Sequence, residues 1–129
     1  MGAAGSNEDQ LIGKYLGTGV QEFLYTMGGS GAEYFEDIDL SSDGLILYAA
    51  GSTNSFSFGE RDHIFLAMRT SGAGSLLWYR RYGSPLEDFL HGLTIDDTDK
   101  YVFMSGGTRG FYRTTTVNMD IPIFKYDLE

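Results

Sequence analysis

The chain has no cysteine, only two prolines, and half as many basic residues as acidic ones. Without cysteine there can be no disulfide scaffold, thiolate zinc site or cysteine nucleophile. Nine lysines and arginines against 18 aspartates and glutamates give a net charge of -9, which argues against a nucleic-acid partner. The longest apolar stretch, residues 44–51, is too short to span a bilayer, and we expect no membrane insertion.

The remaining composition is typical of a single folded domain. The 129 residues include 18 glycines, and 42% of the chain is hydrophobic and 15% aromatic, which indicates a core-forming protein. The first eight residues are small or polar and lack the basic region and apolar run of a signal peptide. We therefore expect a flexible lead over residues 1–8 and a folded region over residues 9–129.

Short aromatic and β-branched runs, bounded by glycine, aspartate and serine, predict an all-β protein. Hairpin turns are expected at residues 17–19, 43–44, 71–74 and 96–99, because glycine and aspartate are favoured where the chain reverses. The predicted strands cover residues 11–16, 22–27, 36–40, 45–51, 63–69, 75–82, 90–95, 100–106 and 121–126.

The sequence also repeats itself at intervals of 53 to 58 residues. Residues 25–30 resemble residues 79–84, and residues 47–53 resemble residues 102–108. The changes in interval are assigned to loops, chiefly residues 112–118, where insertions cost little. The comparison pairs Gly29 with Gly83, Glu33 with Glu87, Gly51 with Gly106, Thr53 with Thr108, and Asp62 with both Asp9 and Asp120.

Each unit contains about four strands, and four-stranded units of this length repeated around an axis form the blades of a β-propeller. Unit 1 covers residues 9–61, unit 2 covers residues 62–119, and residues 120–129 begin a third unit. We expect residues 9–27 to supply two outer strands of one blade, residues 36–82 a whole blade, and residues 90–126 three strands of another. A stacked solenoid is the structural alternative.

About two blades cannot close a ring, so this is expected to be an incomplete propeller with exposed sheet faces and edges. Those ends would contact other blades of a longer propeller or further copies of the chain. Packing of the two units into a small sandwich is a third possibility.

The units resemble the SBBP-type β-propeller repeat of large secreted or surface-attached bacterial proteins. An aromatic residue precedes a glycine turn, an acidic residue follows, and an Asp-Gly hairpin leads to a strand ending in Gly-x-Thr. Thr98 and Asp99 depart from this pattern, which prefers glycine there, and residues 56–59 replace the usual Phe-Pro. The repeat-defining positions are Gly29, Glu33, Gly51, Thr53, Asp62, Trp78, Gly83, Glu87, Gly106, Thr108 and Asp120.

The resemblance implies a non-catalytic scaffold for protein–protein interaction, located outside the cell or on its surface and without a cofactor. Two alternatives remain open. One is a carbohydrate-binding surface protein, with or without calcium, and the other is a piece of a propeller hydrolase or lyase. An enzyme needs titratable groups that converge on a cleft, whereas a lectin needs exposed aromatic rings.

Acidic residues supply two weak candidates for a site. Asp37 and Asp39 alternate on a predicted strand and share one face, close to Glu33 and Glu36, as calcium ligands or paired carboxylates would. Asp96, Asp97 and Asp99 form the densest acidic cluster and are the calcium candidates of a hairpin turn. A solvated strand face and an ordinary aspartate turn explain both patterns without a metal.

The other candidates are aromatic or basic. His63 and His91 are the only histidines, and we expect them to lie apart. Alternation places Trp78 and Arg80 on one strand face and Tyr79 and Arg81 on the other, where they can bind a sugar or base or protect a blade edge. The candidate partner surface is a rim formed by Phe56, Phe58, Phe111 and Tyr112, in the loops after each Gly-x-Thr.

Overall fold

The computed structural model describes residues 8–57, 59–110 and 119–128. These ranges contain nine β-strands and no helix, so the predicted all-β class is confirmed, and none of their segments is a helix able to cross a membrane. The strands are β1 (Gln10–Tyr15), β2 (Gln21–Met27), β3 (Glu33–Leu40), β4 (Ile46–Thr53), β5 (Asp62–Arg69), β6 (Leu76–Tyr82), β7 (Asp88–Ile95), β8 (Tyr101–Thr108) and β9 (Ile123–Asp127).

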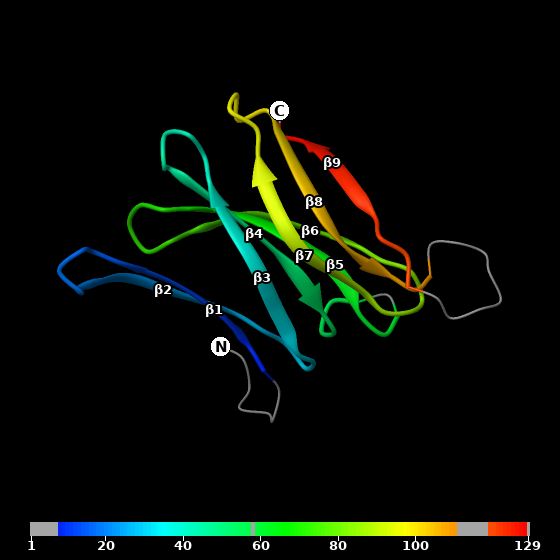
Figure 1. The fold of residues 1–129 in the computed structure, drawn as a ribbon. Helices are drawn as coiled ribbons and strands as arrows, with labels where there is room; N and C mark the ends of the chain where they lie inside the picture. Colours follow the sequence, from blue (N-terminus) through cyan, green and yellow to red (C-terminus); the bar gives the residue numbers. More distant parts are fainter. Residues whose placement is uncertain (1–7, 58, 111–118, 129) are drawn as a thin grey trace.

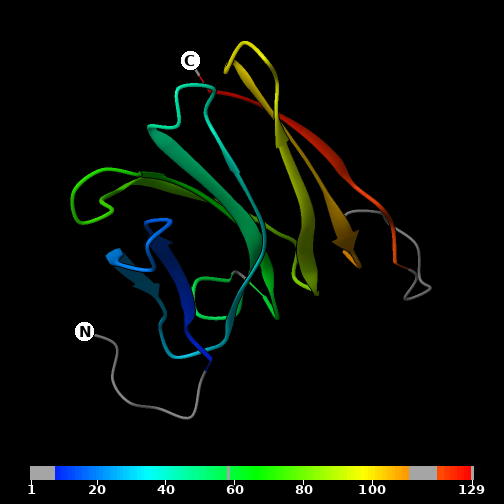
Figure 2. The same ribbon diagram turned by 60° about the vertical axis from the view of Figure 1, so that its left-hand side comes forward.

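Three antiparallel sheets follow one another along the chain. The first sheet is the hairpin β1–β2, the second is the four-stranded meander β3–β6, and the third consists of β7–β9. They lie side by side as successive layers with the second sheet in the middle (Figure 1 and Figure 2). The expected grouping of two, four and three strands is confirmed, and the described strands form no closed ring.

A β-bulge interrupts the first strand of the second sheet and of the third sheet at matching places. The register shifts between Phe35 and Asp37 in β3, and at the corresponding point in β7. Gly51 and Gly106 lie opposite the bulges, where a Cβ would overlap a backbone carbonyl group of the facing strand. Pairing continues past these glycines, so β4 and β8 end two residues later than predicted.

The hydrophobic core lies between the sheets in two clusters. The second sheet is covered on both sides, and every residue of β5 except Arg69 is therefore buried. The first cluster contains Ile12, Phe23 and Met27 of the first sheet with Leu47, Ala49, Ile64, Leu66 and Met68 of the second. The second cluster contains Tyr48, Ala50, Phe65 and Ala67 of the second sheet with Leu90, Leu93, Val102 and Met104 of the third.

Corresponding turns join the first two strands of the second and third sheets. Gly44 has a φ of 70° in the β3–β4 turn, and Asp99 has a φ of 56° in the β7–β8 turn. Aspartate is among the few residues other than glycine that adopt this conformation with modest strain. The departure from the repeat pattern at Asp99 therefore preserves the turn geometry that glycine provides in the second sheet.

Candidate functional site

Backbone hydrogen bonds identify the corresponding residues of the second and third sheets. The amide of Glu33 donates to the carbonyl of Glu8 at 2.9 Å, and the amide of Asp88 donates to the carbonyl of Arg61 at 2.8 Å. The bulges and pairings of β3 with β4 recur in β7 with β8 at a constant interval of 55 residues. The two hairpins are therefore equivalent residue by residue.

The threonine that ends each hairpin meets the aspartate that opens the next unit. Thr53 pairs with Asp62 at the start of β5, and Thr108 forms an isolated antiparallel bridge with Asp120. These contacts confirm the sequence match of Asp62 with Asp120 and of Thr53 with Thr108.

A buried carboxylate joins the two strands of each hairpin at this same end. The hydroxyl of Thr53 donates to Glu33 Oε1 at 3.1 Å, and the hydroxyl of Thr108 donates to Asp88. All four of these residues are fully buried. We call these contacts the carboxylate–threonine pairs, and each satisfies a hydroxyl that has no access to water.

Each pair is extended by the chain segment that enters the hairpin. The second carboxylate oxygen of Glu33 accepts the amide of Gly29 at 3.2 Å, and that of Asp88 accepts the amide of Ser84 at 2.5 Å. The amide donors lie four residues before the acid in both cases. Both oxygens of each carboxylate therefore have a structural role.

The predicted match of Glu33 with Glu87 is wrong by one residue, because Asp88 occupies the equivalent buried position. Glu87 lies at the surface, where it forms an ion pair with Arg109 at 3.0 Å. The sequence comparison missed Asp88 because an aspartate there replaces a glutamate and a glutamate precedes it.

The predicted match of Gly29 with Gly83 is also wrong by one residue. Gly28 and Gly83 are the equivalent glycines. A Cβ on Gly28 would overlap the side chain of Asp9, which precedes β1, and a Cβ on Gly83 would overlap the side chain of Asp62, which begins β5. Gly29 therefore corresponds to Ser84, the residue that follows Gly83.

Glycine and serine exchange places across this contact. Gly29 packs against Ser55 in the second sheet, whereas Ser84 packs against Gly110 in the third. The Ser55 hydroxyl accepts the amide of Gly31 at 2.7 Å, and the Ser84 hydroxyl accepts the amide of the equivalent residue, Leu86, at 3.2 Å. One hydroxyl and one empty Cβ position are therefore retained, although the residues that provide them are reversed.

Asp37 and Asp39 share a face as predicted, and they bridge two sheets. Asp37 accepts the amide of Ile38 at 2.9 Å through Oδ1 and the amide of Leu93 in β7 at 2.8 Å through Oδ2. Asp39 accepts the amide of Leu40 at 2.8 Å through Oδ1 and the amide of Ile95 in β7 at 3.0 Å through Oδ2. The carboxylates thus cap amides on the edge of β7, as structural groups at the contact between β3 and β7.

The acidic cluster at residues 96–99 also organises its own turn. A hydrogen bond from the Thr98 hydroxyl, followed by bonds from backbone amides of the turn, lowers the pKa of Asp96. Asp99 accepts the amide of Ser42 at 2.9 Å, which connects the turns of two sheets, and Asp97 is exposed. Among the described residues, no three acidic, histidine or cysteine side chains are placed to hold a metal ion.

The two histidines lie apart, as expected. His63 is fully buried between the second and third sheets, with Nε2 3.3 Å from the carbonyl of Gly107 and its ring edge-on to Phe124. Burial lowers the pKa of His63, although nearby Asp88 opposes this shift. His91 is exposed on β7, with Nδ1 4.0 Å from a carboxylate oxygen of Glu36.

The basic and aromatic residues of β6 alternate as predicted. Trp78 packs into the core cluster facing the third sheet, and the Arg80 guanidinium lies 5.3 Å from the centroid of the Trp78 ring. On the other face, Tyr79 packs against Phe56, and Arg81 donates to the Phe56 carbonyl. These residues hold a strand and a loop together.

Only Phe56 of the predicted rim lies within the described residues. Its ring packs against the first core cluster and lies 6.0 Å from the Tyr79 ring, so it serves as a support for its loop. Phe58, Phe111 and Tyr112 lie outside the described part of the chain.

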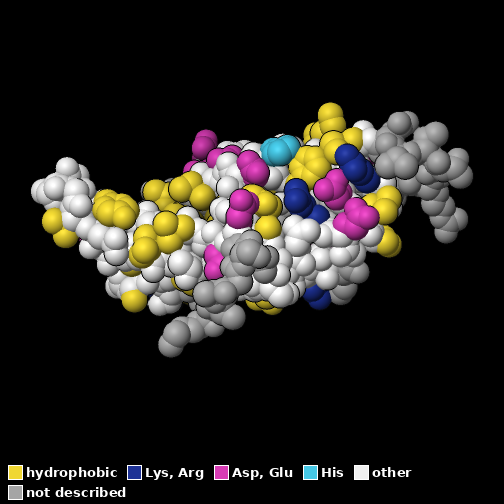
Figure 3. All heavy atoms as spheres, turned by 90° about the horizontal axis from the view of Figure 1, so that it is seen from below, with side chains coloured by type: hydrophobic (Ala, Val, Ile, Leu, Met, Phe, Trp, Pro, Cys, Tyr) yellow, Lys and Arg dark blue, Asp and Glu magenta, His cyan; other side chains and the backbone are white. Residues whose placement is uncertain are grey.

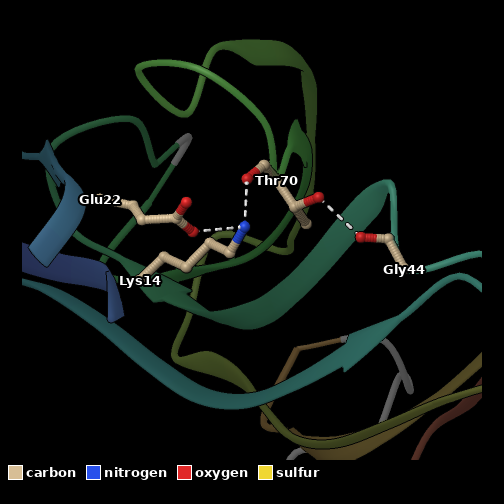
Figure 4. Close-up of polar contacts among 4 residues, drawn as sticks. All are labelled: Lys14, Glu22, Gly44 and Thr70. Atoms are coloured by element: carbon tan, nitrogen blue, oxygen red, sulfur yellow. Dashed lines mark hydrogen bonds and ion pairs between the residues drawn. The ribbon is translucent and has the colours of Figure 1, made fainter. Parts of the chain in front are cut away.

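A polar contact between the first and second sheets was not predicted. Lys14 Nζ lies 2.6 Å from Glu22 and donates to the carbonyl of Thr70 at 3.0 Å, and the Thr70 hydroxyl donates to the carbonyl of Gly44 (Figure 4). Three hairpins meet through these bonds. A lone lysine in a strand gives no sequence signal for such a contact, because its partner is a backbone carbonyl 56 residues away.

Large apolar side chains are exposed on the two outermost sheet faces. The β1 face is the outer side of the first sheet, and the β9 face is the outer side of the third. Hydrophobic side chains are visible at the end of the molecule where β1 and β2 lie (Figure 3). The β1 face contains Leu11, Tyr15 and Leu24, and the β9 face contains Phe103, Ile121 and Ile123. A monomeric protein rarely leaves such surfaces uncovered unless they bind something.

The exchange of glycine and serine predicts strong coupling between positions 29 and 55. Gly29→Ser alone introduces an overlap with Ser55, and Ser55→Gly alone removes the hydroxyl that caps an amide, so each should destabilise the fold by about 1–3 kcal/mol. The double variant reproduces the arrangement of the third sheet and should recover most of that loss. A double-mutant cycle from urea unfolding measures the coupling, and additive effects would contradict the assigned register.

The burial of His63 predicts that stability falls as the pH is lowered. In the unfolded chain His63 binds a proton near its ordinary pKa of about 6.5, while in the folded chain it binds one only at lower pH. The contribution of the neutral, buried His63 to stability is therefore complete above about pH 6.5 and is lost as the pH falls below it. The free energy of unfolding of His63→Gln should change less between about pH 7.5 and about pH 5.5 than that of the wild type. His91→Gln is the control, and an equal effect of both variants would refute the prediction.

No protein-family model matches this chain, and a search of curated proteins finds no match.

Proposed function

We propose that the chain is a run of propeller-blade repeats that serves as a non-catalytic scaffold for protein–protein interaction. The observation that carries the proposal is the recurrence of one hairpin, with the same bulge and the same buried carboxylate–threonine pair, in two neighbouring sheets. A repeated structural unit that ends in uncovered sheet faces is suited to contact further units or other proteins.

The use made of the charged side chains also supports a scaffold. Glu33, Asp88, Asp37 and Asp39 accept hydrogen bonds that join strands or sheets. Carboxylates with these roles differ from a catalytic pair, which must face a cleft where a substrate can enter. Large apolar side chains are instead exposed at the outer faces, as in proteins that bind other proteins.

The apolar faces make the proposal testable with a fluorescent dye that binds exposed hydrophobic surface. At low protein concentration, the folded wild type should increase the dye fluorescence. Leu11→Glu and Ile123→Glu should each remove a substantial share of it, because a charge is placed in the middle of one face. Leu45→Glu is the matched control, since Leu45 is about as exposed as Leu11 but lies in the β3–β4 turn.

The same protein distinguishes the scaffold from the carbohydrate-binding alternative. A scaffold of this kind should keep its melting temperature when calcium is added and should give no signal on a glycan array. A rise in melting temperature with calcium that a chelator reverses would contradict the proposal, and so would binding to a glycan. Dye fluorescence that is the same for the wild type and both face variants would also contradict it.

A further inference from the structure

We propose that a second copy of this chain is the partner of the exposed faces, with the β9 face of one copy bound to the β1 face of the next. This inference rests on the proposed function, in which the sheets are successive copies of one repeat. Its basis is a residue-by-residue match between the exposed faces and the two sheet interfaces that already exist inside the chain.

The β1 face corresponds to the side of the second sheet that the first sheet covers. The pairing of β1 with β2 matches that of β5 with β6, which places Leu11 over Ile64 and Tyr15 over Met68. Ile64 and Met68 are 0% exposed beneath the first sheet, whereas Leu11 and Tyr15 are 55% and 56% exposed. The β1 face is thus an interface of the repeat without its neighbour.

The β9 face corresponds to the opposite side of the second sheet, which the third sheet covers. The pairing of β8 with β9 matches that of β4 with β5, which places Phe103 over Tyr48 and Ile123 over Phe65. Phe65 is 0% exposed, whereas Ile123 is 79% exposed. A shallow groove on the third sheet is lined by Thr94, Phe103 and Ile123. The face that a neighbouring sheet would cover is therefore present but open.

The order of the sheets inside the chain pairs the β9 face with the β1 face and pairs neither face with itself. Inside the chain, the side of one sheet that matches the β9 face always packs against the side of the next sheet that matches the β1 face. Binding of a second copy therefore continues the same order of layers, which is a head-to-tail contact. Two β1 faces packed together would reproduce no contact that the chain contains.

A lysine on the β9 face adds a polar match. Lys125 occupies the position of Lys14, whose ammonium group crosses the first interface to the carbonyl of Thr70 (Figure 4). In the free chain Lys125 Nζ lies 3.6 Å from the centroid of the Tyr101 ring. In the assembly we expect it to reach a carbonyl of the β1–β2 turn of the second copy.

Two features should make this contact weaker than the internal ones and therefore reversible. Gly92 and Thr94 stand in β7 where Asp37 and Asp39 stand in β3, so the two bridging carboxylates are missing. Each copy also has a net charge of -9, so copies repel one another at low ionic strength. Association should therefore strengthen as salt is added.

Sedimentation velocity over a range of concentrations tests the proposal, with light scattering to give the mass. The wild type should form concentration-dependent oligomers, while Leu11→Glu and Ile123→Glu should each weaken association about tenfold or more by placing a charge in the contact. An equimolar mixture of the two variants retains one intact β1 face and one intact β9 face. It should form a dimer of twice 14.3 kDa and no larger species.

Leu45→Glu is the control and should associate like the wild type. Leu24→Lys and Ile121→Lys provide a second pair on the same two faces, and circular dichroism checks that each variant is folded. A wild type that stays monomeric, or a mixture that fails to form the dimer, overturns the proposal. If the dye still binds a monomeric wild type and responds to the face variants, the scaffold proposal survives while the second copy is excluded as the partner.

Discussion

A buried carboxylate that accepts a threonine hydroxyl is the contact on which the repeated hairpin depends. The pair joins the start of the first strand to the end of the second, at the point where the chain continues toward the next unit. The threonine also pairs with the aspartate that opens the following segment. One buried polar contact therefore fixes the register of the hairpin and the place at which the next segment joins it.

The contacts between sheets build on this fixed register. The bulge just beyond the carboxylate directs Asp37 and Asp39 toward β7, where they cap amides that the edge strand would otherwise present to solvent. A slip of one residue would reverse the faces of β3 and move both carboxylates away from those amides. The layered arrangement of sheets and the two core clusters thus follow from the hairpin geometry.

Strand positions and the grouping of strands could be predicted from the sequence, because short apolar runs bounded by glycine and aspartate recur at a near-constant interval. The match between the units was right for residues 47–53 and 102–108 but wrong by one residue for Gly29 and Glu33. Ser84 stands where Gly29 stands in the earlier unit, and Asp88 stands where a glutamate was expected, so matching of identical letters favoured Glu87. Chemical equivalence, in which either acid accepts the threonine, is visible only in the contacts.

The candidate sites were harder to predict than the fold. The contacts that Asp99 and Lys14 make with other sheets join residues more than fifty positions apart and involve backbone groups, which carry no sequence signal. In the acidic turn Asp96 accepts the amide of Tyr101, and on the basic strand Arg81 donates to the carbonyl of Phe56, so both patterns contribute to local structure. The exposure of Leu11 and Ile123 became informative only when their buried equivalents in the second sheet were known.

The stability of Asp88→Ala compared with that of Glu87→Ala tests the central claim most directly. If Asp88 is the buried acceptor of the repeat, its loss leaves the proton of the Thr108 hydroxyl and the Ser84 amide without an acceptor and should cost about 3 kcal/mol in the free energy of unfolding. Removal of Glu87, whose side chain forms a surface ion pair with Arg109, should cost less than about 1 kcal/mol. Equal losses, or a larger loss for Glu87→Ala, would contradict the account.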